Sequence, residues 1–119
     1  MGDVIRFVAK DVSLDPQVGF IGFADQEGQR YFWMQPGEMT TVKDEIWLER
    51  DDQGWGGRGG VWNVVLSRHK FVVNTRELPW MASDAVAIEF AVDDSTYARL
   101  KDLLRQVMAD CPADLAIQD

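Results

Sequence analysis

Two residue types that often carry chemistry are almost missing from the sequence: its 119 residues include one cysteine, Cys111, and one histidine, His69. A single cysteine excludes an internal disulfide, and the shortage of both residues argues against a zinc centre, so we expect no bound metal. Long hydrophobic runs are also missing, because Asn63 interrupts the apolar stretch 61–66, whereas a membrane-spanning helix needs about 20 apolar residues. The N-terminal MGDVIRFVAKD lacks both the apolar stretch of a signal peptide and a myristoylation pattern. We therefore expect a cytoplasmic protein that has no contact with membranes.

Basic side chains are scarce as well: 12 lysines and arginines stand against 20 aspartates and glutamates, which gives a formal net charge of −8. This balance argues against nucleic-acid binding, because such proteins neutralise phosphates with Lys and Arg. An acidic surface suits a basic protein partner, although the same charge also arises in proteins that are acidic only for solubility. Hydrophobic residues at 46% and charged residues at 27% are typical of a folded chain, and residues 1–119 are long enough for a single domain.

Short strands are predicted over the first two thirds of the chain by runs of apolar and β-branched residues. The expected strands are 4–9, 19–24, 31–35, 45–49, 61–67, 70–75 and 85–92, with Arg68 and His69 in the turn of a β-hairpin. Over 94–110 the apolar residues recur at helical spacing; Asp93, Asp94 and Ser95 offer N-cap oxygens, and Pro112 stops the helix. The sequence therefore predicts an α+β fold, in which an antiparallel β-sheet of about six to seven strands carries a C-terminal amphipathic helix packed on one face.

The sequence shows no arrangement of residues that is typical of a catalytic site. Cys111 continues the apolar stripe of the predicted helix and His69 lies in a predicted turn, so the two do not suggest a Cys–His nucleophile pair. The acidic pair at 51–52 consists of adjacent residues, which point to opposite faces of a strand, and the pair at 93–94 is explained by helix capping. We therefore expect a protein that is not an enzyme and needs no cofactor.

The most unusual stretch is 49–60, ERDDQGWGGRGG. It lacks the Gly-Lys-Ser/Thr ending of a phosphate-binding loop and the closing Glu of a calcium loop. Its glycines predict a wide hairpin loop or bulged connection, in which Trp55 either folds back onto the core or forms part of a contact surface. Within 38–52, six acidic and two basic residues give a local net charge of −4.

Acidic side chains beside large aromatic ones are typical of protein–protein contacts, where Trp anchors the interface and charge tunes association. The sequence therefore predicts a partner-binding surface around residues 45–58. Its candidate residues are Glu45, Trp47, Glu49, Asp51, Asp52, Gln53, Trp55 and Arg58.

The same segment carries a resemblance to a known family. The run 46–53 (IWLERDDQ), the glycine cluster 56–60 (GGRGG) and the following 64–68 (VVLSR) resemble the immunity protein 10 family of bacterial polymorphic toxin systems, and the similarity covers roughly residues 44–108. This resemblance implies a non-enzymatic cytoplasmic protein that binds and neutralises a cognate toxin. A basic nuclease toxin fits the acidic segment best. Trp55 and His69 depart from the family's pattern, which leaves the identity of the toxin open.

An alternative hypothesis is a small-ligand binding module of the same fold. Its apolar pocket would lie between the sheet and the helix and would be lined by side chains such as Trp33 and Met34. A homodimer formed through an edge strand is also left open.

Overall fold

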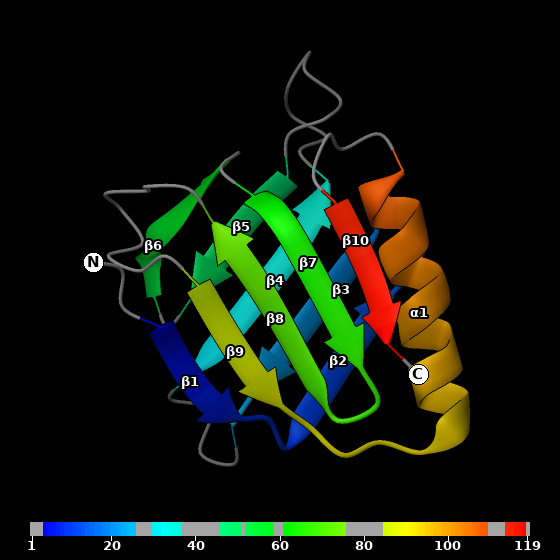
Figure 1. Ribbon diagram of the computed structural model, residues 1–119. Coiled ribbons are helices and arrows are strands. Elements are labelled where there is room, and N and C mark those ends of the chain that lie inside the picture. Colours follow the sequence, from blue (N-terminus) through cyan, green and yellow to red (C-terminus); the bar gives the residue numbers. More distant parts are fainter. Residues whose placement is uncertain are drawn as a thin grey trace.

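The computed structural model describes residues 4–25, 30–36, 46–50, 52–58, 61–75, 85–109 and 114–118, and it gives only the backbone of 35, 36, 46–50, 52–58, 61, 62 and 75. These ranges contain ten strands and one helix (Figure 1). In chain order they are β1 (Val4–Val8), β2 (Asp11–Asp15), β3 (Phe20–Ala24), β4 (Tyr31–Pro36), β5 (Ile46–Arg50), β6 (Asp52–Arg58), β7 (Val61–Ser67), β8 (Lys70–Thr75), β9 (Ala85–Glu89), α1 (Asp94–Met108) and β10 (Asp114–Gln118).

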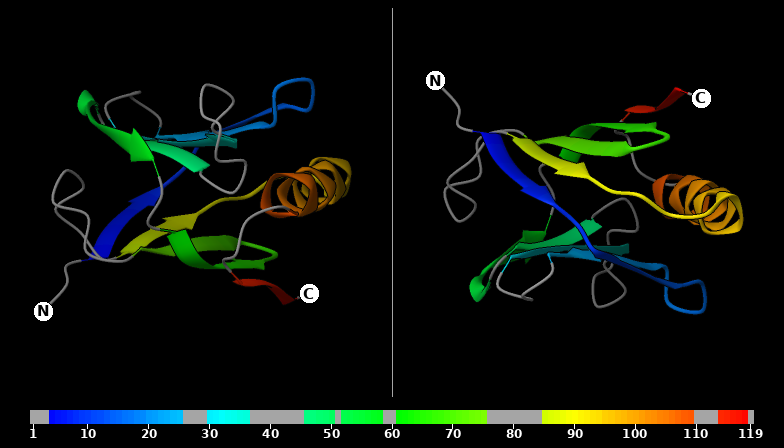
Figure 2. Two further views of the ribbon diagram at one scale, coloured as in Figure 1. Left: turned by 90° about the horizontal axis from the view of Figure 1, so that it is seen from above. Right: turned by 90° about the horizontal axis from the view of Figure 1, so that it is seen from below.

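The strands form two five-stranded sheets that face each other (Figure 2). Sheet A has the order β1-β9-β8-β7-β10 and is mixed, because β1 runs parallel to β9 and β10 parallel to β7. Sheet B has the order β2-β3-β4-β5-β6 and is antiparallel throughout. The strands of one sheet run across those of the other (Figure 1). In such packings a strand can pass from one sheet into the next at a corner.

One corner lies between β1 and β2. The amide of Ala9 donates to the carbonyl of Glu89 in sheet A at 2.8 Å, and the amide of Lys10 donates to the carbonyl of Ala24 in sheet B at 2.8 Å. Two consecutive residues are therefore bonded to different sheets, which fixes the point where the chain leaves sheet A and enters sheet B.

The core lies between the two sheets and is built by alternation along the strands. Sheet B contributes Ile21, Phe23, Phe32 and Met34, and sheet A contributes Val64, Leu66, Phe71, Val73, Val86 and Ile88, all of them fully buried. The ring of Phe71 stacks on Phe23 at a centroid distance of 4.9 Å and lies 6.2 Å from Phe32. These ring contacts join the two sheets, and the residues between them along each strand face outward.

Helix α1 closes one side of the sandwich, where it packs against β2, β3 and β10 (Figure 2). Asp93 is the N-cap, and its Oδ1 accepts a hydrogen bond from the Thr96 amide at 2.8 Å. The buried side chains of the helix are Tyr97, Leu100, Leu103, Leu104, Val107 and Met108. The helix thus spans the edges of both sheets.

Several expectations are confirmed: the α+β class, the amphipathic helix with its cap at Asp93, and the hairpin of β7 and β8 around Arg68 and His69. The strand arrangement differs from the expected single antiparallel sheet, since ten strands are divided between two sheets and two pairs are parallel. The helix is also followed by a further strand, β10, and contacts both sheets instead of one face. Strand pairing depends on contacts far apart in the chain, which local patterns do not reveal.

The expected loop over 49–60 is wrong for Asp52–Arg58, which forms strand β6 at the edge of sheet B. A strand ladder is made by backbone groups, so a glycine-rich segment can pair with a neighbour although its side chains add little. The pairing of β5 with β6 is irregular, because its register shifts between Glu49, which is opposite Gly56, and Arg50, which is opposite Asp52.

Candidate functional site on the outer face of sheet B

The structure places most of the predicted partner-binding residues on two neighbouring strands at one edge of sheet B. Trp47 and Glu49 belong to β5, and Asp52, Gln53, Trp55 and Arg58 belong to β6. Glu45 and Asp51 lie outside the described residues, and the side chains of both strands lie outside them as well. The ladder sets Trp47 opposite Arg58 and Glu49 opposite Gly56. The backbone register therefore brings β5 and β6 together, as a contact surface on this segment requires.

An aromatic cluster that sequence reasoning missed lies beside this edge, on the outer face of sheet B. Trp33 in β4 contacts Phe20 in β3 edge to face, with ring centroids 5.5 Å apart, and Tyr31 lies 4.9 Å from Trp33. The side chain of Trp33 is 39% exposed. We call Phe20, Tyr31 and Trp33 the aromatic face. Its rings support one another on a sheet, so Trp33 is held in place while it remains open to solvent.

Gly22 makes room for this cluster. A Cβ atom built on Gly22 would lie 2.8 Å from Cε1 of Phe20, 2.9 Å from its Cζ, and 3.3 Å from Cδ1 of Trp33. Any side chain at this position would push the Phe20 ring away from its place over the glycine. The signal in the sequence is the combination of a glycine inside an apolar strand with aromatic residues at alternate positions of the next strand.

The strand register connects the aromatic face to the predicted segment. Glu49 is directly opposite Trp33, and Trp47 is opposite Gln35. Residues directly opposite each other share a face of the sheet, so these two positions of β5 continue the aromatic face.

Acidic residues border the aromatic face on its other side, along the edge strand β2. Asp11 and Asp15 are exposed, and the register sets Asp15 opposite Phe20 and Asp11 opposite Ala24. Along β2, β3 and β4, the outward side chains that the structure describes include no basic residue. Two exposed acidic side chains therefore border the aromatic face along β2.

His69, Asp93 and Asp94, which are of residue types that often act in catalysis, do not belong to the aromatic face. Among the parts of the chain that the structure covers, no group of three His, Cys, Asp or Glu side chains could hold a metal ion. His69 is exposed in the β7–β8 turn, and Cys111 lies outside the described residues. Asp93 caps the helix, where hydrogen bonds from Thr96 lower the pKa of its carboxyl, and Asp94 pairs with Arg68 at 2.9 Å.

The residues of the alternative ligand pocket are separated by the structure. Met34 is fully buried in the core between the sheets, whereas Trp33 points outward from the same strand. Neighbouring residues of a strand point to opposite faces, so these two side chains do not line one cavity.

Comparison with protein-family models, curated proteins and solved structures finds no match to this chain. The likeness to the immunity protein 10 family stays a prediction from the motif at 46–68. In the ranges that the structure covers, no helix has the length and apolar character needed to cross a bilayer.

Proposed function

We propose that the protein is a non-enzymatic immunity protein, which binds a cognate bacterial toxin in the cytoplasm and neutralises it through the outer face of sheet B. The observation that carries this proposal is the solvent-exposed Trp33, which contacts Phe20 and Tyr31 and lies opposite Glu49 in the ladder. Trp and Tyr are enriched among the few residues that dominate binding energy. Because the sheet already orders these rings, little side-chain entropy is lost when a partner covers them.

The chemistry of this face favours a basic partner. Asp11 and Asp15 border the aromatic face, and Glu49 of the acidic segment is opposite Trp33 in the ladder. A partner's arginine can stack its guanidinium on the exposed Trp33 ring while nearby carboxylates accept its hydrogen bonds. A toxin with a basic nuclease domain has this chemistry, and blocking the surface that binds nucleic acid would neutralise it.

The first experiment identifies the toxin and tests protection directly. Tagged protein captures its partner from the native cell lysate at low salt, and high salt releases a partner held through charge. The captured protein is then expressed alone and together with the wild-type chain. The proposal predicts that it arrests growth alone and is tolerated in the presence of the wild type. If no captured protein is toxic, the proposal is wrong.

Trp33→Ala then tests the aromatic face. Loss of a central Trp anchor typically costs about 2 kcal/mol or more, which is roughly 30-fold in Kd. Gly22→Ala keeps Trp33 and displaces Phe20, so it should weaken binding less. Val4→Ala is the matched control, because it trims an exposed apolar side chain on sheet A. Equal affinity of Trp33→Ala and Val4→Ala would place the contact surface elsewhere.

Charge reversal at Glu49, Asp51 and Asp52 tests the acidic segment separately. We expect weaker binding with a smaller salt dependence, since rim charges act chiefly on the association rate. Unchanged protection in this variant would remove the segment from the site, whether or not Trp33 contributes.

A further inference from the structure

A second surface with different chemistry lies on the outer face of sheet A. The outward positions of β9 and the residues after it are small, with Ala85, Ala87 and Ala91 placed around Glu89. Ala87 is only 6% exposed, whereas Val8 on the neighbouring strand β1 is 50% exposed. The surface therefore dips along β9 between the larger side chains of β1 and β8. We call this depression the β9 trough.

Two hollows make up the trough. One of about 550 Å³ lies over Ala9, Phe90 and Ala91, between Lys10 and His69. The other, of about 240 Å³, lies over Ala87 beside Arg6. The two share Val8, Lys70 and Glu89 in their walls, so they form one continuous depression. From Ala87 to Ala91 it follows four residues of extended chain, which span roughly 13 Å.

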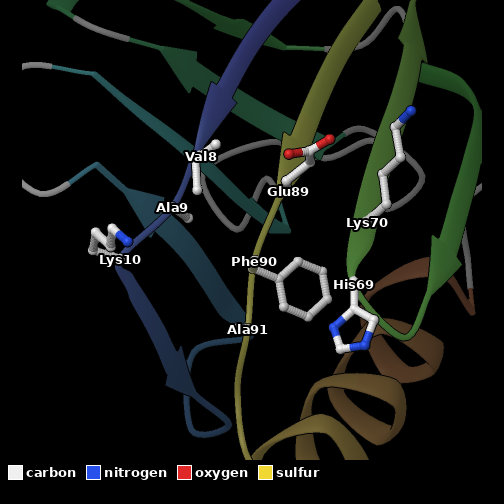
Figure 3. A pocket seen from close by; sticks show the side chains of 8 residues that line it. All are labelled: Val8, Ala9, Lys10, His69, Lys70, Glu89, Phe90 and Ala91. Carbon is white, nitrogen blue, oxygen red and sulfur yellow. The ribbon is translucent and has the colours of Figure 1, made fainter.

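Cationic side chains stand at both ends of the trough, although the chain as a whole is strongly acidic. Arg6 lines the hollow over Ala87, Lys10 and His69 line the hollow over Ala91, and Lys70, which is opposite Glu89 in the ladder, lines both; its amine points toward the Ala87 end (Figure 3). Glu89 lies between Val8 and Lys70 (Figure 3), as the register of β9 with its two neighbours requires. Three basic side chains and one acid leave a local charge of +2 when His69 is neutral.

These cations are available to a ligand. Within the described ranges, none of Arg6, Lys10 and Lys70 takes part in an ion pair, and all three are exposed. The alanine floor leaves space for a ligand to lie close to the sheet. Glu89 lowers the positive potential in the middle of the trough, so the potential is highest at its ends.

We propose that the β9 trough binds a small molecule with an anionic group at each end, such as a bisphosphate or a dicarboxylate. One anionic group is held by Arg6 and Lys70, and the other by Lys10 and His69. Charge-assisted hydrogen bonds from Lys and Arg are the usual recognition of both phosphate and carboxylate. Glu89 disfavours a third anionic group at the centre and accepts a hydrogen bond from a hydroxyl there.

The test is calorimetric titration of the full chain at low salt with a hexose bisphosphate, adipate, inorganic phosphate and acetate. The two-ended probes should bind more tightly than the single anions, and the comparison of bisphosphate with adipate shows which anionic group the trough prefers. Lys10→Ala and Arg6→Ala should each weaken the two-ended probes roughly tenfold, as expected for one lost charge-assisted hydrogen bond. Glu89→Gln should tighten adipate binding, because it removes the central negative charge.

Arg99→Ala is the matched control, since it removes one positive charge from the exposed side of helix α1. An equal loss in Arg99→Ala would show that the anions respond to overall charge and would overturn the site. Absence of binding by both two-ended probes, or no preference over the single anions, would overturn it as well. Arg6 and Glu89 lie on sheet A, away from the aromatic face on sheet B, so the Arg6→Ala and Glu89→Gln results test the trough independently of the proposed toxin contact. Lys10 lies at the corner between the two sheets, so Lys10→Ala is also checked for unchanged toxin binding.

Discussion

Arg68 ties the β7–β8 turn to the start of helix α1, and its replacement by alanine should destabilise the fold measurably. Its Nη2 donates to the carbonyl of Val92 at 2.8 Å and to Oδ1 of Asp94 at 2.9 Å. Its guanidinium carbon also lies 4.8 Å from the centroid of the Tyr97 ring. One side chain thus connects sheet A to the two residues that flank the helix cap and to the first buried residue of the helix.

The size of the effect follows from the burial of each contact. The Asp94 side chain is fully exposed, so its ion pair contributes little. The bond to the partly buried Val92 carbonyl has a charged donor and contributes about 1.5–3 kcal/mol. The contact with Tyr97 adds about 0.5–1 kcal/mol. The buried Nη1, which has no hydrogen-bond partner among the described residues, subtracts part of this gain. A net loss of about 2 kcal/mol remains.

For 119 residues, an unfolding entropy of about 2.1 cal/mol/K per residue converts this loss to a fall of about 8 °C in Tm. Differential scanning calorimetry of Arg68→Ala, Arg68→Lys and Asp94→Asn measures it. The lysine keeps the charge and lacks the planar group, so it should unfold between the alanine variant and the wild type. The reasoning fails if Arg68→Ala melts within about 2 °C of the wild type. It also fails if Asp94→Asn, which removes only the exposed partner, costs as much as Arg68→Ala.

Two further predictions concern helix α1. Leu104 is fully buried against the sheets, so Leu104→Ala should lower the free energy of unfolding, measured by chemical denaturation, by about 2–5 kcal/mol. Ala98→Gly, on the exposed side of the helix, is the control: it lowers helix propensity without removing a buried side chain and should cost less. Hydrogen bonds from Thr96 lower the pKa of Asp93, so its carboxylate stabilises the folded state above the ordinary carboxyl pKa and this contribution is lost as the pH falls through the lowered value. The free energy of unfolding of Asp93→Asn, measured in urea from neutral to strongly acidic pH, should therefore be lower than that of the wild type at neutral pH and should fall less on acidification. If the two free energies fall in parallel with pH, the capping role is contradicted.

Local patterns predicted those elements whose residues are close in the chain. The hairpin of β7 and β8 follows from two apolar runs separated by Arg68 and His69, and the structure reproduces both strands and the turn. Helix α1 follows from its apolar spacing and from Asp93, which caps it as expected. In both cases the deciding interactions join residues a few positions apart, and these are readable from sequence.

The sheet arrangement depends on contacts that are remote in sequence. The passage from sheet A to sheet B is set by the amides of Ala9 and Lys10, whose acceptors are Glu89 and Ala24. Strand β2 has the sequence DVSLD, in which only two apolar residues alternate with polar ones, and it was not expected as a strand. Its pairing with β3 and the packing of helix α1 against it stabilise a segment that has a weak pattern of its own.

The candidate site also combines features that the local sequence predicts with features that depend on remote contacts. Charge and aromatic character make Glu49 and Trp47 candidates, and the structure places the backbone of both beside a cluster that local patterns do not reveal. The alternative hypothesis places Trp33 in an interior pocket together with Met34, but strand alternation sends the two side chains to opposite faces. The face on which an aromatic residue lies depends on which neighbour is buried, and for Trp33 this is decided by the packing of Met34 in the core.

The two proposed surfaces lie on opposite sides of the sandwich, because each uses the outward face of a different sheet (Figure 2). Between them is a core in which Phe71 of sheet A stacks on Phe23 of sheet B, and close-packed interiors resist small displacements. A toxin bound to the aromatic face, as proposed, would therefore leave the β9 trough open, and a small anion bound in the trough would not touch Trp33. Coupling between the two sites would require a second arrangement of this core that both ligands favour. With one tightly packed arrangement, the two proposed surfaces would act independently, and a variant on one of them should leave binding at the other unchanged.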